Sequence, residues 1–144
     1  MIEQDTIRLL RECDAGVKMG ISSIDDVLGH VQAPRLETVL SDGKREHETL
    51  GAEIQTRLDR FRDEGKEPPA IASAMSSMMT KVKLTAHESD HTIADLMTDG
   101  CNMGVKTLSR YLNQYAAADE GSKDIAKRLI RLEESMAVDI RSFL

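Results

Sequence analysis

One short stretch of the sequence, His87-Glu88-Ser89-Asp90-His91, carries the side chains of a zinc site. Residues four apart lie on the same face of a helix, so the imidazoles of His87 and His91 could bind one zinc ion. Glu88 would then act as a general base toward a zinc-bound water. The site also needs a third protein ligand, for which the candidates are Asp95, Asp99 and Glu120. This motif predicts a zinc-dependent hydrolase.

Other features of the sequence weigh against that hydrolase. Asp90 places a charge inside the motif, where zinc peptidases with this pattern usually carry uncharged residues. No segment has the period-two alternation of a strand that would hold an extended substrate. Asp90 is also a competent helix N-cap, and a helix that begins there would separate His87 from His91. We therefore expect no catalytic residues here and keep the zinc hydrolase, with metal ligands His87 and His91, as the weaker alternative.

Apolar residues recur at steps of three and four along nearly the whole chain, which is typical of helices. The expected N-caps are Asp5, Asp90 and Ser122, and the expected breaks are Pro34 and Gly121. A charged run at 57–67 is expected to be a solvated helix end. The predicted helices cover residues 5 to about 29–33, 36 to about 64, 70–86, 92–118 and 122–143. The predicted fold class is all-α.

An internal repeat organises these helices. Cys13–Lys18 recurs as Cys101–Lys106, and apolar positions of the first helix of each hairpin coincide when the chain is shifted by 88 residues. After a one-residue slip in the turn the second helices coincide as well, with Leu36, Leu40 and His47 on Ile125, Leu129 and Met136. The repeat predicts a single domain of two helical hairpins, 5–64 and 90–144, joined by a crossover at 68–89 that carries the short helix. A four-helix bundle with one long crossover is the ferritin-like arrangement.

This order of elements resembles the small bacterial ferritin-like domains of rubrerythrin type, many of which have no known function. The stretch Asp90–Lys106 is similar to the start of their third long helix. The resemblance covers most of the chain and implies a ferritin-like four-helix bundle with a short crossover helix. Di-iron members place a carboxylate on the first and third long helices and Glu-x-x-His on the second and fourth.

Carried over residue by residue, that pattern is largely lost. The carboxylate positions read Asp14 and Asn102, and the Glu-x-x-His positions read Lys44-x-x-His47 and Glu133-x-x-Met136. The positions that keep a ligand type are Asp14, His47 and Glu133. A lysine in the site would also repel metal ions. We predict a degenerate metal site at these three residues, with no bound cofactor.

The layers of the bundle point the same way. Antiparallel pairing places His47 level with Gly20, about 9 Å along the axis from Asp14, so the two cannot share one metal. We expect His47 to bond a backbone carbonyl or a hydroxyl, and Asp14 to pair with a lysine or arginine. Gly16 and Gly20 are expected to be close-packing positions.

The two cysteines, Cys13 and Cys101, occupy equivalent places in the two hairpins and could approach each other. Two cysteines are too few for a disulfide framework, so the expectation is two small, buried, unreacted thiols.

The composition limits the classes of partner that the protein can bind. The 144 residues suit one domain, and 19 basic against 25 acidic side chains give a net charge of −6. An acidic chain without a basic stripe is a poor binder of nucleic acid. No run of 18 apolar residues and no signal-peptide pattern occur, so we expect no membrane segment and a cytoplasmic location.

These observations predict a non-catalytic structural or interaction protein, with a homodimer or another protein as partner. The dimer hypothesis rests on the Met-rich crossover, where Met75, Met78 and Met79 could cover an apolar face. The alternative is a ferritin-like metal-binding oxidoreductase or storage-type protein that uses iron at Asp14, His47 and Glu133. The zinc hydrolase is the third hypothesis.

Overall fold

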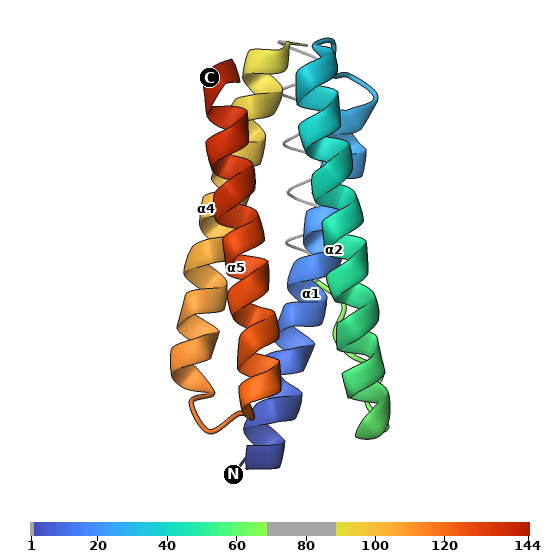
Figure 1. Cartoon of the computed structure of the whole chain (residues 1–144), viewed down its shortest axis with the longest axis vertical. Helices are drawn as coiled ribbons and strands as arrows, with labels where there is room; N and C mark the ends of the chain where they lie inside the picture. The colour runs from blue at the N-terminus through green and yellow to red at the C-terminus, as the bar shows by residue number, and fades with distance from the viewer. Residues whose placement is uncertain (1, 69–88) are drawn as a thin grey trace.

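The computed structural model describes residues 2–68 and 89–144, and the described chain is all-helical (Figure 1). No strand occurs within these two ranges, so the all-α prediction is confirmed as a helical bundle. The predicted helix at 70–86 and the crossover methionines Met75, Met78 and Met79 lie outside the described residues. The described elements are α1 (Ile2–Leu28), α2 (Pro34–Arg60), α4 (Asp90–Gln114), α5 (Glu120–Ile140) and the short 3-10 helix η1 (Arg141–Phe143).

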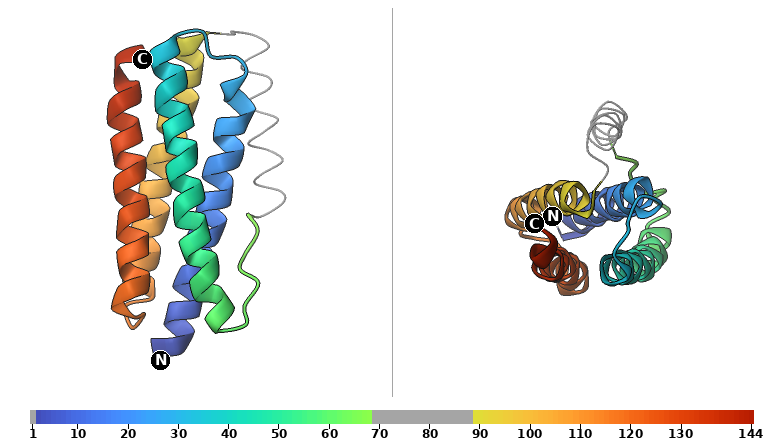
Figure 2. Two further views of the ribbon diagram at one scale, coloured as in Figure 1. Left: turned by 45° about the vertical axis from the view of Figure 1, so that its right-hand side comes forward. Right: turned by 90° about the horizontal axis from the view of Figure 1, so that it is seen from above.

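The four long helices pack as two antiparallel pairs. α1 lies mainly against α2 and α4 mainly against α5, and the pairs meet through α1 with α4 and α2 with α5. Figure 2, seen from above, shows this four-sided arrangement. α1 and α5 run in one direction while α2 and α4 run in the other, so α2 ends at one end of the bundle and α4 begins at the opposite end (Figure 1). A tight turn cannot join two such helices.

The core follows from the spacing of the apolar residues. Side chains at steps of three and four face the bundle axis on all four helices, and each one fully buried stabilises the fold by about 1.5–3 kcal/mol. Positions that the repeat makes equivalent are buried alike, as in Leu36 with Ile125 and Leu40 with Leu129. Fully buried members of the core include Leu9, Ile24, Leu36, Leu40, Ile54, Ile93, Ile125, Leu129 and Ile140.

Each pair of helices holds the turn of the other pair. The carboxylate of Asp90, at the start of α4, accepts hydrogen bonds of 2.9 Å from the backbone N–H groups of Gln32 and Ala33 in the α1–α2 turn. Reciprocally, Thr6 near the start of α1 accepts a 2.8 Å bond from the backbone N–H of Asp119 in the α4–α5 turn. Turn N–H groups that no helix satisfies are thereby paired, and the two helix pairs are fixed in register.

The prediction of Asp90 as N-cap is wrong by one residue. Ser89 is the N-cap of α4, with its Oγ accepting a 3.2 Å bond from the backbone N–H of Thr92. Ser and Asp are both good caps. The carboxylate of Asp90 is instead committed to the α1–α2 turn.

The predicted start of the last helix is also corrected. Asp119 is the N-cap of α5 and accepts a 2.8 Å bond from the backbone N–H of Ser122. Gly121 and Ser122 therefore lie in the first turn of α5 and do not precede it. α1 likewise begins at Ile2, ahead of the predicted cap Asp5.

Candidate functional site

Two buried polar side chains, His47 of α2 and Glu133 of α5, meet inside the bundle. His47 is 1% exposed and Glu133 is 8% exposed. The His47 Nε2 atom lies 2.8 Å from Glu133 Oε1, and its Nδ1 atom lies 2.7 Å from the carbonyl oxygen of Gly43, one turn earlier in α2. A carbonyl only accepts, so Nδ1 carries a proton, and a second proton lies between Nε2 and Oε1.

The environment of His47 favours the charged imidazole. Burial lowers the pKa of His47, but the hydrogen bond and charge of Glu133, together with the Gly43 carbonyl, outweigh it and raise the pKa above 6.5. The pair is therefore an imidazolium–carboxylate ion pair in which each partner removes the cost of burying the other. The predicted bond from His47 to a backbone carbonyl is confirmed.

The contact with Glu133 was not predicted, although the sequence holds a signal for it. Met136 is the repeat equivalent of His47, and Glu133 lies three residues before Met136, hence on the same inward face of α5. If the inward face of α5 that carries Glu133 packs against the inward face of α2 that carries His47, the two side chains meet.

Glycines on the opposite helices make room for the pair. A Cβ atom at Gly20 of α1 would lie 2.6 Å from His47 Nε2, and one at Gly104 of α4 would lie 3.4 Å from Glu133 Cδ. His47 thus packs directly on the α1 backbone at Gly20. This confirms that His47 lies level with Gly20 along the bundle axis and that Gly20 is a close-packing position.

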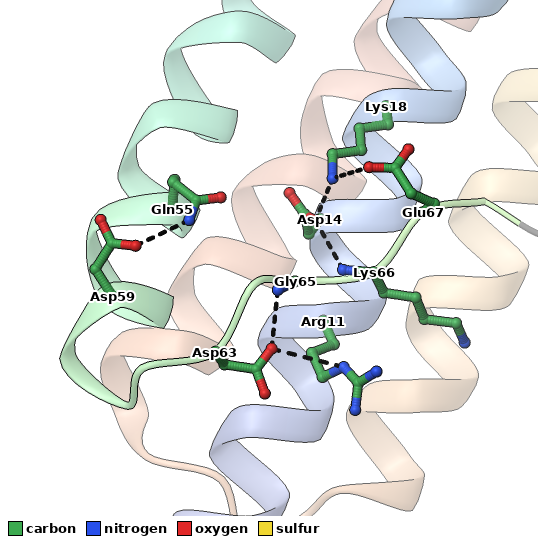
Figure 3. A network of polar contacts seen from close by, with 9 residues as sticks. All are labelled: Arg11, Asp14, Lys18, Gln55, Asp59, Asp63, Gly65, Lys66 and Glu67. Carbon is green, nitrogen blue, oxygen red and sulfur yellow. Dashed lines mark hydrogen bonds and ion pairs between the residues drawn. The ribbon is translucent and has the colours of Figure 1, made fainter.

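Asp14, the third predicted metal ligand, belongs to a different cluster. Its carboxylate is buried, lies 2.9 Å from Lys18 Nζ, and accepts a 2.9 Å hydrogen bond from the backbone N–H of Lys66 (Figure 3). Gly65 passes so close, with φ of +86°, that any Cβ there would clash with this carboxylate. The predicted pairing of Asp14 with a lysine is confirmed.

The segment after α2 is fastened to α1 by further contacts around Asp14. Glu67 forms an ion pair with Lys18 at 2.7 Å, and Asp63 approaches Arg11 at 3.8 Å (Figure 3). The charged run at 57–67, expected to be a solvated helix end, therefore binds along α1 in its second half. Asp14 positions this segment.

The structure brings His47 and Glu133 together but leaves the other carried-over positions apart. Lys44 pairs with Asp25 at 2.8 Å, and Asn102 is exposed. Within residues 2–68 and 89–144, no group of three or more His, Cys, Asp or Glu side chains is arranged to hold a metal ion. The described arrangement suits an ion pair, which needs only two partners.

The zinc motif is divided by the start of α4. His91 is exposed in the first turn of α4, and Ser89, its N-cap, has an extended backbone with φ −147° and ψ 156°. The helix therefore does not continue back through Ser89 toward His87 and Glu88, both of which lie outside the described residues. The proposed third ligands are all exposed: Asp95, Asp99 and Glu120.

Both cysteines are buried free thiols, as expected. Burial, reinforced by the charges of Glu12 and Asp14, raises the pKa of Cys13 to about 12. Burial and the neighbouring Glu133 raise the pKa of Cys101 well above its ordinary range. Neither thiol supplies a thiolate nucleophile at neutral pH.

A cavity of about 480 Å³ lies between α1 and α4 and reaches His47 and Glu133. Its walls are largely apolar, with glycines at several positions. The described lining includes Gly16, Gly20, Met97, Gly100, Gly104 and Leu108.

The chain was compared with protein-family models, curated proteins and solved structures, and none of them matches. Over the described residues, no helix is long and apolar enough to cross a membrane.

Replacing Gly20 by Ala tests the packing of the pair. The new Cβ would lie 2.6 Å from His47 Nε2, so we expect a loss of about 1–3 kcal/mol in the free energy of unfolding. Gly100→Ala is the matched control, because its Cβ meets nothing within 4 Å and should gain about 0.5–1 kcal/mol. Urea unfolding measures both. Equal effects of the two substitutions would contradict the packing.

The pair also predicts a pH dependence of stability. Because the folded-state pKa of His47 is raised above 6.5, its contribution is complete below about pH 6 and is lost as the pH rises through the folded-state pKa. The difference in free energy of unfolding between the wild type and His47→Gln should therefore shrink as the pH rises from about 6 through the folded-state pKa. Urea titrations across this range provide the measurement. A difference that stays constant or grows would be incompatible with the charged pair.

Proposed function

We propose that the protein is a non-catalytic structural or interaction protein built on a degenerate ferritin-like bundle. The observation that carries this proposal is the buried His47–Glu133 ion pair. It occupies the interior position at which the resemblance expects a metal ligand pair, with a net charge of zero.

The ferritin-like part of the proposal is supported by the direction of the helices. α2 and α4 run parallel, so the connection between Arg60 and Asp90 crosses the length of the bundle, as in ferritin-like folds. The reciprocal binding of the two turns supports a duplicated hairpin. On these grounds we propose that the whole bundle has the fold of the bacterial rubrerythrin-type domains.

The chemistry of the pair argues for a role without metal. A metal ion would have to displace the proton that His47 shares with Glu133, and Asp14 is already bound to Lys18 and the Lys66 backbone. Two donors hold a divalent ion poorly when the remaining ligands are water. Iron binding at Asp14, His47 and Glu133 would require these contacts to break.

The partner is a second copy of the chain or another protein. Met103 of α4 is 61% exposed and gives the described surface an apolar point of contact. Sedimentation velocity at micromolar concentration distinguishes dimer from monomer.

We place the protein in the cytoplasm, because Cys13 and Cys101 are both buried free thiols.

Metal analysis tests the proposal. We expect protein purified without a histidine tag to hold no stoichiometric iron or zinc, and its thermal midpoint to be unchanged by a chelator, because no binding free energy is lost. His47→Ala and His91→Ala are analysed in parallel. Stoichiometric iron that is lost only in His47→Ala would establish the ferritin-like metal protein, and zinc lost only in His91→Ala would establish the hydrolase.

A further inference from the structure

The cavity between α1 and α4 reaches from the surface of the bundle, where Met103 is exposed, into its interior. α1 and α4 are neighbours in the bundle, yet the lining extends past them to His47 on α2 and to Glu133 and Met136 on α5. Along α1 it runs from Glu12 to Ile24, a distance of about 18 Å. Its volume of about 480 Å³ lies in the range of small-molecule sites.

Glycines keep this space open at a cost that packing does not explain. Gly20 is required by His47, but a Cβ atom at Gly100 would meet nothing within 4 Å, and one at Gly16 would make ordinary contacts at 3.7 Å. Each glycine inside a helix is less stable than alanine. Gly16 is therefore better explained by the room that a larger side chain there would fill, whereas Gly100 lines the cavity from an exposed position of α4.

Glu133 presents unused acceptor capacity to the cavity. The residue is 8% exposed, and its Oε1 accepts a hydrogen bond from His47. Within the described chain, the one other donor beside it is the thiol of Cys101, which is a weak one. A carboxylate has about four acceptor sites, so Glu133 can accept a further hydrogen bond from a molecule in the cavity.

Among the described residues of the wall, the charges cancel. His47 pairs with Glu133 at 2.8 Å, and at the far end Lys66 pairs with Glu12 at 2.6 Å. A charged ligand would therefore enter without a counter-ion, which is costly in an apolar cavity. A neutral ligand avoids this cost.

We infer that the cavity between α1 and α4 binds one neutral, elongated, apolar molecule, of the class of medium-chain alcohols, whose hydroxyl donates a hydrogen bond to Glu133. A helix of a partner protein, about 10–12 Å across, cannot pass between α1 and α4 to reach Glu133. This site goes beyond the proposed structural or interaction role and does not depend on it.

Three probes that share an eight-carbon chain test the site in the wild-type protein. Titration calorimetry should show saturable 1:1 binding of 1-octanol and at least about tenfold weaker binding of octyl methyl ether, which has no donor. Octanoate should not bind, because its carboxylate would face Glu133. Absence of saturable octanol binding, or equal affinity for all three probes, would overturn the inference.

A filling substitution places the bound molecule. Gly16→Leu adds a side chain beside Leu108 and Leu129 and should weaken octanol binding at least about tenfold. Gly29→Leu adds the same side chain where nothing lies within 4 Å and should bind octanol as the wild type does. Equal affinity of the two variants would overturn the assignment. If circular dichroism shows Gly16→Leu to be unfolded, the comparison of the three probes decides alone.

Discussion

The bundle is organised around a proton shared between His47 and Glu133. Burying either charge alone would cost several kcal/mol, and the pair is tolerated because each side chain has its partner at hydrogen-bond distance. This contact joins α2 to α5 in the interior of the bundle. It also requires glycine at Gly20 of α1, where a Cβ atom would lie 2.6 Å from His47 Nε2.

The same glycine links the ion pair to the cavity. The glycine at position 20 lets His47 approach the α1 backbone closely. A cavity is left where none of the described side chains fills the space between α1 and α4. Glycine thus accounts both for close packing at Gly20 and for the space that a side chain larger than alanine would fill at Gly16. The ion pair forms the polar end of an otherwise apolar site.

Much of the fold could be predicted from the sequence, because the apolar spacing is helical throughout and leaves no alternative period. The stripe residues Leu36 and Leu40 are buried as expected, and so are their repeat equivalents. The helix starts were harder, because neighbouring residues compete for the cap. Ser89 is the N-cap of α4, because the Asp90 carboxylate binds the α1–α2 turn. That bond joins distant parts of the chain.

The candidate site was predictable only in part. The lysine partner of Asp14 lies one turn away in the same helix and could be expected, whereas the Lys66 backbone contact depends on the path of the chain after α2. The bond from His47 to Glu133 joins two helices, and the sequence indicates it only when the inward faces that carry His47 and its repeat equivalent Met136 are paired with each other. The cavity could not be predicted from the sequence, because a glycine in a helix is compatible both with close packing and with open space.

Nitrogen-15 NMR of the His47 imidazole tests the central claim most directly. At neutral pH the account predicts that Nδ1 and Nε2 are both protonated in the wild type, and that Nε2 loses its proton in Glu133→Gln, where burial again lowers the pKa of the imidazole. A neutral ring with an unprotonated Nε2 in the wild type at pH 7 would contradict a charged pair at the centre of this bundle.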